Sequence, residues 1–294
     1  MRTHRSNRIT VLVFILPTLI WFTVMVIYPT ARTLFMSTYK WDGIIPGTFT
    51  GIKNYIQLFN DTIFYTSIKN GFIFAAVITI YQIGLGTVFA LILIDKKIKG
   101  RNILRKIYFI PVVLSITVSC MLWVSMYNPN YGLFNKIFEL LGISYRQDWL
   151  SSMGVSSIIA VAIVNAWQYM GYQFTLLYSG AKSIPIELYE AAKIDGASTV
   201  MAHTKITIPL MQEVYRIVLI FCMIGGMNAF ANMQIMTNGG PGTATYSLTF
   251  LMYRSAFMVG QYGYGCASAV ILMLLCFAIT LVINRFVARE RIVY

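Results

Sequence analysis

The sequence has little charge. Only 11% of its 294 residues are Asp, Glu, Lys or Arg, whereas a soluble domain carries about 25%. So few charges cannot cover a surface that faces water, and 57% of the residues are hydrophobic. The composition therefore excludes an ordinary soluble domain and predicts a protein whose surface faces mostly lipid.

Histidine and cysteine are too few and too scattered for a metal site. The two histidines, His4 and His203, are isolated, and the four cysteines form no Cys-x-x-Cys pair and no Cys/His spacing. Three of the cysteines lie in apolar runs and the fourth borders one, so we interpret them as small apolar residues. We expect no metal ligands in this chain. The cysteines are Cys120, Cys222, Cys266 and Cys276.

Three further absences narrow the function. No Gly-x-x-x-x-Gly-Lys-Ser/Thr run occurs, so this chain has no loop of that kind to hold ATP phosphates. The ten acidic residues all lie outside the apolar runs, which argues against an autonomous secondary transporter, because these usually need an ionisable group at membrane depth. No pair of a nucleophile and a base indicates an enzyme.

The net charge of +13 lies in loops and tails rather than in a basic soluble domain, so we expect no nucleic-acid binding.

Six apolar runs are long enough to cross a bilayer as helices. They predict an all-α membrane protein with a single transmembrane domain over residues 1–294. The third run is the least regular, because Pro111 and several Ser and Thr residues interrupt it. The predicted spans lie near residues 9–28, 71–94, 107–127, 153–178, 217–236 and 267–283.

Basic residues predict the orientation of these spans. Lys and Arg are in excess in the N-terminus, residues 95–106, residues 179–213 and the C-terminus. Because cytoplasmic loops carry the excess of Lys and Arg, we expect these segments and both termini to be cytoplasmic. The first run follows basic residues as in a signal peptide, but it has about 19 apolar residues and no small-residue cleavage site, so it predicts an uncleaved span.

The long loop at residues 179–213 has the signals of a helical hairpin outside the membrane. Ser183 is a candidate N-cap and Pro185 lies near the first helical position. Gly196 predicts a left-handed stop. Ser198 then caps a second short helix that should end before Pro209.

The same loop carries a family resemblance. Residues 184–197 read Ile-Pro-Ile-Glu-Leu-Tyr-Glu-Ala-Ala-Lys-Ile-Asp-Gly-Ala, and Ile-Thr-Ile-Pro-Leu follows at 206–210. This pattern resembles the EAA loop of permease subunits of binding-protein-dependent ABC importers. The resemblance implies the type I importer permease fold, with residues 179–213 as the loop that docks onto a separate ATPase subunit. The residues that the motif assigns to ATPase coupling are Glu187, Glu190, Ala191, Ala192, Asp195 and Gly196. The alternative is a surface loop that packs only on its own span ends.

Other segments are similar to the carbohydrate branch of these permeases. Residues 237–245, Thr-Asn-Gly-Gly-Pro-Gly-Thr-Ala-Thr, resemble the glycine-proline segment that follows the fifth span. The resemblance implies that Gly239, Gly240 and Pro241 face the binding protein on the outer side, and a simple outer turn is the alternative.

The resemblance also implies a substrate path between the two spans that flank the loop. Amides bind sugar hydroxyls and aromatic rings stack on sugar faces, so these residue types within the spans are candidates for the path. The alternative is hydrogen bonding between helices. The candidates are Asn165, Trp167, Gln168 and Tyr172 in the fourth span, and Asn228 and Asn232 in the fifth.

The function that the resemblance implies is the permease subunit of an ATP-driven sugar importer in a bacterial plasma membrane. Its partners would be a second permease subunit, a dimeric ATPase and an extracellular solute-binding protein. The second permease subunit could be another copy of this chain, but in this branch it is often a different chain. The chain itself would hold no cofactor and catalyse nothing, because ATP and magnesium would bind the ATPase. No basic residue lies deep in the predicted spans, so a neutral oligosaccharide is favoured over glycerol-3-phosphate or an acidic sugar. The runner-up functions are an autonomous transporter of a small polar solute and a membrane enzyme or scaffold.

Overall fold

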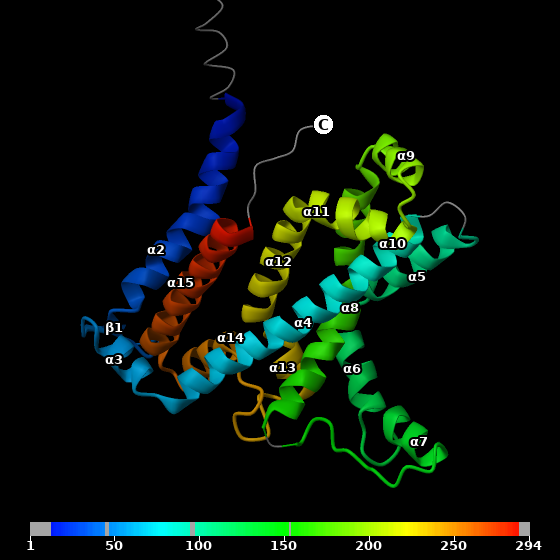
Figure 1. The fold of residues 1–294 in the computed structure, drawn as a ribbon. Helices are drawn as coiled ribbons and strands as arrows, with labels where there is room; N and C mark the ends of the chain where they lie inside the picture. Colours follow the sequence, from blue (N-terminus) through cyan, green and yellow to red (C-terminus); the bar gives the residue numbers. More distant parts are fainter. Residues whose placement is uncertain (1–12, 45–46, 95–97, 153, 288–294) are drawn as a thin grey trace, which may run out of the picture. The chain divides into compact units, whose positions relative to one another are not determined.

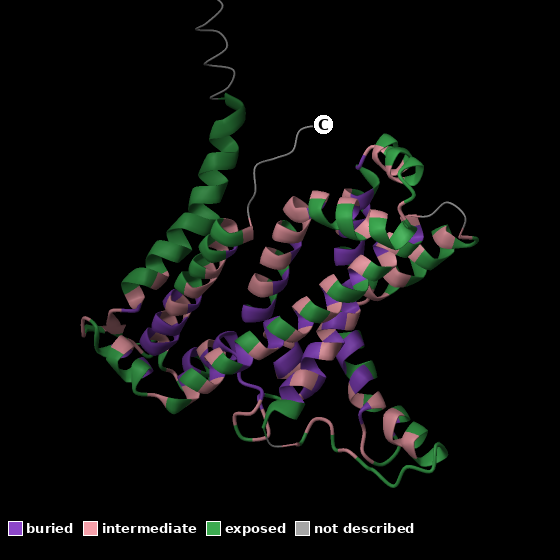
Figure 2. Ribbon diagram, viewed as in Figure 1, coloured by how far each residue is buried: buried purple, intermediate pink, exposed green. Residues whose placement is uncertain are grey.

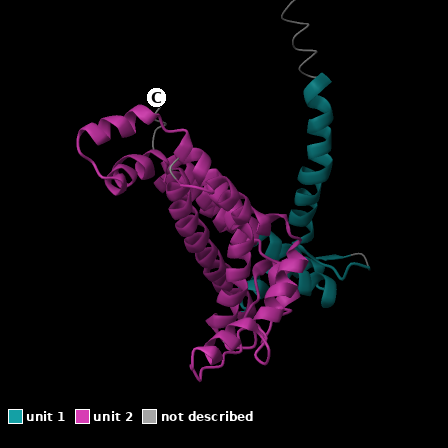
Figure 3. Ribbon diagram, turned by 90° about the vertical axis from the view of Figure 1, so that its right-hand side faces the viewer, with its two compact units in different colours: residues 1–61, 252–271 teal, residues 62–251, 272–294 magenta. Residues whose placement is uncertain are grey.

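The computed structural model describes residues 13–44, 47–94, 98–152 and 154–287, and these are mostly helical (Figure 1). The all-α prediction is therefore confirmed. Contacts divide the chain into two compact units, Met1–Asp61 with Met252–Ile271 and Thr62–Leu251 with Leu272–Tyr294 (Figure 3). The first helix contributes to this division, because its apolar side chains stay exposed rather than packing inside the chain.

The first unit starts with a long helix over Val13–Met36, which contains the π turn η1 (Thr23–Ile27) and ends as α2 (Tyr28–Met36). A two-stranded antiparallel hairpin follows, in which Tyr39 pairs with Phe49. Asn54 ties the hairpin to the rest, because its Nδ2 donates to the carbonyl of Ser37 at 2.7 Å and of Tyr39 at 2.9 Å. The other elements are β1 (Tyr39–Lys40), β2 (Thr48–Phe49), α3 (Lys53–Phe59), η3 (Arg254–Met258) and the start of α15 (Tyr262–Val287).

The second unit is built around helix α8 (Val155–Lys182). Helix α4 (Thr62–Ile94) packs along most of it, α12 packs on α4, and α5 lies against α8. Buried residues run through α8, which is the centre of this unit (Figure 2). The other helices are α5 (Arg101–Val113), α6 (Ile116–Met126), α7 (Leu133–Leu140), α9 (Ile186–Ile194), α10 (Thr199–Ala202), η2 (His203–Thr207), α11 (Ile208–Leu210), α12 (Gln212–Met227), α13 (Ala231–Met236) and α14 (Leu248–Tyr253).

The observed helices differ from the six predicted spans. Within the described residues, three helices are long and apolar enough to cross a membrane, Val13–Met36, α4 and α15, or five if each of two bent pairs is one span. Helix α8 has the length but carries Asn, Gln and Tyr side chains along it. The first, second and sixth predicted spans fall on helices that extend beyond their predicted bounds.

The predicted third span, residues 107–127, is two helices that meet at 98°. Pro111 lies inside α5, and the break comes later, where Leu114 is extended and the Ser115 Oγ accepts from the amide of Val118 at 3.3 Å. Gln168 of α8 donates from its Nε2 to the Leu114 carbonyl at 3.0 Å. A broken helix is tolerated at membrane depth when a neighbour binds the freed backbone in this way.

The predicted fifth span, residues 217–236, is also interrupted. Helix α12 ends at Met227, and α13 starts at Ala231. The carbonyl of Ala229 in the gap accepts from the hydroxyls of Ser247 and Thr249, each at 2.7 Å. These hydroxyls stabilise the break, and no pattern of apolar residues could have shown it, because they come from a segment later in the chain.

Candidate functional site

The break between α12 and α13 opens a polar pocket against α8. The pocket has a volume of about 520 Å³ and lies within the second unit. Five helices, α4, α6, α8, α12 and α13, and the 228–230 gap supply its walls. The described residues that line it are Ile78, Gln82, Ile116, Asn165, Tyr169, Tyr172, Gln173, Phe221, Cys222, Gly225, Asn228, Ala229, Phe230, Ala231 and Asn232.

Two of the pocket asparagines are bonded to each other. The Asn165 Nδ2 donates to the Asn232 Oδ1 at 3.0 Å, and the Asn232 Nδ2 lies 3.5 Å from the Cys120 Sγ. Gln82 reaches the same wall, where its Nε2 donates to the Asn165 carbonyl at 3.4 Å. The sequence left two alternatives for these amides, lining a pocket or joining helices by hydrogen bonds. Asn165 and Asn232 do both.

Other polar groups on the pocket wall make fewer hydrogen bonds to neighbouring helices. Asn228 is exposed, and its Nδ2 donates to the Ile224 carbonyl one turn earlier at 2.9 Å and contacts the Cys276 Sγ at 3.5 Å. Gln173 is buried, and its Oε1 has no hydrogen-bond partner among the described residues. This oxygen is an unpaired buried acceptor, which is costly, although it has almost no accessible surface from which a ligand could reach it.

Aromatic rings form the rest of the pocket wall. Tyr172 is 43% exposed, and its ring lies 6.4 Å from the ring of Phe221 in an edge-on arrangement. Tyr169 and Phe230 also line the pocket. No described lining residue carries a charge. Uncharged amides beside exposed ring faces suit a ligand with many hydroxyls and apolar C–H faces.

Four of the six predicted path residues lie in this pocket: Asn165, Tyr172, Asn228 and Asn232. The other two do not. Trp167 packs with its ring 5.6 Å from that of Trp123, and Gln168 is 1% exposed and binds the break between α5 and α6. A helix turns 100° per residue, which places Trp167 on the side of α8 opposite Asn165. Gln168 lies only about 60° from Asn165 around the helix, so its hydrogen bond to the Leu114 carbonyl, and not its helical position, keeps it out of the pocket.

Sequence reasoning missed Gln82, Tyr169 and Phe221. Tyr169 is four residues after Asn165, so helical spacing alone would have placed it on the same face. Gln82 is a lone amide in an apolar span, which is itself a signal for a functional or interhelical role. Phe221 has no signal of this kind, because an aromatic residue in a membrane span is ordinary.

The predicted hairpin outside the spans is present. Helix α9 ends in a left-handed Gly196 with φ of +77°. The amide of Gly196 donates to the Lys193 carbonyl at 3.1 Å and that of Ala197 to the Ala192 carbonyl at 2.9 Å. This is the Schellman arrangement, which needs the positive φ, so the predicted stop at Gly196 is confirmed.

Two details of the hairpin were predicted wrongly. Ser183 is not the N-cap of α9, because it ends α8 and donates from its Oγ to the Gly180 carbonyl at 2.8 Å. Ser198 does cap the second helix, accepting from the Met201 amide at 3.2 Å. That helix continues through Pro209, because the π turn η2 widens the backbone just before the proline ring and the proline falls at the start of α11.

The residues predicted to couple to the ATPase lie on an open surface of this hairpin. No residue of α9 is buried, and Glu187, Glu190, Ala191, Asp195 and Gly196 are exposed, while Ala192 is half-buried. Ile194 is 86% exposed and Val200 is 72% exposed. Apolar side chains this exposed are typical of an interaction surface.

A polar contact braces the hairpin from inside. Thr207 is buried, and its Oγ1 lies 2.9 Å from the Tyr189 Oη and 3.1 Å from the His203 Nδ1. Tyr189 comes from α9, and the other two come from the second helix. The two arms are therefore joined by side chains and not only by the turn at Gly196.

The glycine-proline loop is only partly accessible. Gly239 is buried, and a Cβ there would lie 2.5 Å from ring atoms of both Tyr246 and Phe250. Gly239 therefore packs inward within this chain, and its contact with a binding protein stays a prediction. Gly240 and Pro241 are half-buried. Asn70 of α4 holds the loop by donating to the carbonyls of Ala244 and Tyr246, each at 3.0 Å.

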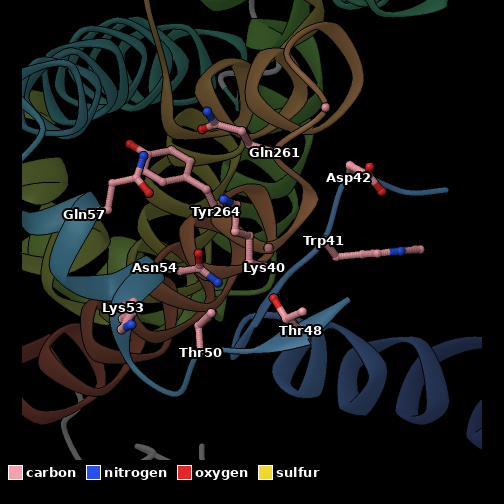
Figure 4. A pocket seen from close by; sticks show the side chains of 12 residues that line it. Lys40, Trp41, Asp42, Thr48, Thr50, Lys53, Asn54, Gln57, Gln261 and Tyr264 are labelled. Atoms are coloured by element: carbon pink, nitrogen blue, oxygen red, sulfur yellow. The ribbon is translucent and has the colours of Figure 1, made fainter. Parts of the chain in front are cut away.

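A second pocket, of about 590 Å³, lies in the first unit, and sequence reasoning did not anticipate it. The β hairpin, α3 and the start of α15 supply its side chains (Figure 4). Lys40 and Lys53 bring positive charge, and Trp41 lies with its ring 5.2 Å from that of Tyr262. Its one sequence signal is the cluster of polar residues in the connection after the first span.

Comparison with known proteins identifies the family to which the chain belongs. The model of the binding-protein-dependent transport system inner membrane component matches residues 82–292. The chain is 33% identical to the probable ABC transporter permease protein YurN of Bacillus subtilis over 96% of this chain and 97% of the relative. It is 35% identical to the trehalose/maltose transport system permease protein MalF of Thermococcus litoralis over 91% and 90%.

A solved structure agrees in fold. A chain of a bacterial ABC transporter that imports the acidic polysaccharide alginate superposes with a TM-score of 0.84 over 100% of both chains, at 21% identity. This likeness concerns the fold alone. Together with the matched family model, the long apolar helices and the helical hairpin show that the chain belongs to the family of binding-protein-dependent ABC importer permeases, as a multi-pass membrane subunit.

Proposed function

We propose that this permease carries a neutral saccharide through the pocket between α8 and the α12–α13 break. The observation that supports this most directly is the lining: amides and aromatic rings, with no charged side chain among the described residues. A sugar binds through hydroxyl–amide hydrogen bonds and through stacking of its C–H faces on rings. An anionic solute would meet no basic side chain here, which favours a neutral substrate over glycerol-3-phosphate or an acidic sugar. The similarity to a trehalose/maltose permease agrees with this choice.

The hairpin over α9 to α11 is the proposed contact for a dimeric ATPase, which would bind ATP and magnesium. Its attachment to the pocket supports a coupling role. Three residues separate the end of α8 at Lys182 from the start of α9, and α11 joins α12 at Met211. Helices α8 and α12 are both walls of the pocket. A displacement of the hairpin would therefore move the pocket walls directly, with no flexible linker between them.

The remaining partners in this proposal are a second permease subunit, usually a different chain, and an extracellular solute-binding protein. Gly240 and Pro241 are the accessible part of the loop that we assign to the binding protein. In this proposal both termini and the hairpin lie in the cytoplasm, on the side of the ATPase, and the distribution of basic residues supports that orientation.

Replacing Asn228 with leucine tests the pocket assignment. Asn228 is exposed on the pocket wall, so its loss removes an amide from the path with little effect on packing. In the reconstituted importer, Asn228→Leu should reduce uptake of a neutral disaccharide about tenfold, the loss expected for one hydrogen bond of about 1.5 kcal/mol. Assembly with the ATPase should be unchanged.

Asn60→Leu is the matched control. Asn60 is also exposed and donates to a carbonyl four residues earlier, Ile56, at 2.9 Å, but it lies outside the pocket. Its uptake should equal wild type. Equal uptake by both variants would reject the pocket as the path, and uptake of only anionic solutes by wild type would reject the neutral substrate.

A further inference from the structure

A groove between α5 and α8 has a basic end and an apolar end. Its volume is about 530 Å³, and it is separate from the saccharide pocket. Arg105 and Lys106 line one end, while Phe109, Ile110 and Val113 continue down the same face of α5. None of the described residues that line it is acidic. The groove therefore changes from cationic to apolar along one helix face.

The two helices nearly touch just beside the groove. A Cβ on Gly171 of α8 would lie 2.2 Å from the carbonyl oxygen of Tyr108 on α5, so the backbones are in direct contact there. Phe174, one turn further along α8, forms the floor of the groove. The groove is thus a built feature of helix packing, and its floor is buried.

The Arg105 guanidinium is held in place at the mouth. Its Cζ lies 4.2 Å from the centre of the Tyr178 ring, and its Nη1 donates to the Tyr178 Oη at 3.4 Å. A guanidinium has five N–H donors, so most of them remain for an anion. Neither Arg105 nor Lys106 makes a salt bridge within the described part of the chain.

We propose that this groove binds an anionic phospholipid, with the headgroup phosphate on Arg105 and Lys106 and an acyl chain along Phe109, Ile110 and Val113. A basic pocket between membrane helices fits an anionic headgroup. Eight residues separate Arg105 from Val113, which is about 12 Å along a helix and suits the upper part of an acyl chain. The basic end is the end of α8 that leads to the hairpin, and the basic-residue rule places it at the cytoplasmic leaflet, where anionic lipids lie. The lipid would pack against α8 at the base of the hairpin.

The test uses the intact importer in nanodiscs and a phosphatidylglycerol probe with a photoreactive acyl chain. The probe should label residues 107–113 and 174–178. Unlabelled phosphatidylglycerol should compete about tenfold better than phosphatidylcholine with the same chains, since each basic residue adds to the attraction. Inorganic phosphate at the same concentrations should not compete, because it lacks the apolar part.

Two double variants separate the groove from general surface charge. R105Q/K106Q should lower labelling about tenfold. K99Q/R101Q removes two charges from the same segment outside the groove, and its labelling should stay within about twofold of wild type. Equal competition by phosphatidylcholine, displacement by phosphate alone, or equal loss in both variants would overturn the proposal. Loss of the second permease subunit from R105Q/K106Q would also overturn it, because the groove would then be a protein interface.

Discussion

At the scale of single residues, this protein uses polar side chains to bind backbone groups that broken helices release. Gln168 binds the carbonyl of Leu114, and Ser247 and Thr249 bind that of Ala229. These bonds replace the helical hydrogen bonds that are lost where α5 meets α6 and where α12 ends. A polar residue in an apolar span can therefore do one of two things here: it can bind a freed backbone group, or it can line the pocket. Only its contacts in the structure show which of the two it does.

A close backbone contact at Gly171 sets the packing of α5 on α8. The Cβ of a larger residue would lie 2.2 Å from the Tyr108 carbonyl oxygen, a distance that no side chain can tolerate, and the obstacle is backbone. Gly171→Val should destabilise the permease by about 1–3 kcal/mol or more, as overpacking does. Thermal unfolding of the purified complex measures this as a lower Tm.

Gly84→Ala is the control for that experiment. Gly84 also lies in a long helix, α4, but a Cβ there meets nothing within 4 Å. It should keep or slightly raise the Tm, because alanine is favoured over glycine in a helix by about 1 kcal/mol. Equal Tm values for Gly171→Val and wild type would contradict the close contact.

At the scale of elements, the hairpin over α9 to α11 is a rigid unit attached to two pocket walls. The Schellman turn at Gly196 closes it at one end, and the contact of Tyr189 with Thr207 joins its arms. No residue of α9 is buried and Ile194 and Val200 are exposed, so turn geometry and polar bonds contribute more to its stability than a core does. If the hairpin transmits displacement as we propose, it can do so only while its turn keeps its shape.

Changing Gly196 to valine should disturb that turn. Its φ of +77° is a left-handed value that costs an L-residue about 1–2 kcal/mol, with more for a β-branched side chain. No atom lies within 4 Å of the added Cβ, so the effect is backbone strain alone. Gly196→Val should lower the saccharide moved per ATP hydrolysed in the reconstituted importer, with normal membrane insertion.

Gly142→Val imposes the same strain elsewhere. Gly142 has φ of +73° and also meets nothing within 4 Å, but it follows α7, away from the hairpin in sequence. Its transport per ATP should match wild type. If both variants transport normally, the shape of the Gly196 turn has no part in coupling.

At the scale of the whole molecule, the distribution of basic residues predicts which ends face the cytoplasm. The basic segments before α5 and around α9 should lie on one side, and the connection that contains α7 on the other. The proposals for the ATPase contact and the anionic lipid both need this orientation. Orientation is a property of the chain in a membrane, so the experiment that tests it uses intact cells.

Single cysteines test the orientation in intact cells. In a background without Cys120, Cys222, Cys266 and Cys276, Lys193→Cys should resist a membrane-impermeant thiol reagent, whereas Glu139→Cys should react. Both positions are exposed, so accessibility within the protein does not distinguish them. Permeabilised cells should show labelling at both sites. The reverse pattern in intact cells would overturn the basic-residue argument.

The sequence by itself determined the class of protein, its family and the hairpin. Low charge and long apolar runs are properties of composition, and the caps at Gly196 and Ser198 act within a few residues, so local pattern is enough to predict them. The family motifs in the hairpin are contiguous in the chain, which is why they could be recognised before any contact was known.

Only the tertiary structure decided where the spans break and which polar residues face the pocket. The break at Ala229 depends on Ser247 and Thr249, and the bond between Asn165 and Asn232 joins α8 to α13. These contacts link residues far apart in the chain, so no periodicity within one helix encodes them. Gln168 belongs to the break at Leu114 and not to the pocket for the same reason: an amide shows its task only when its partner, supplied by another helix, is in place.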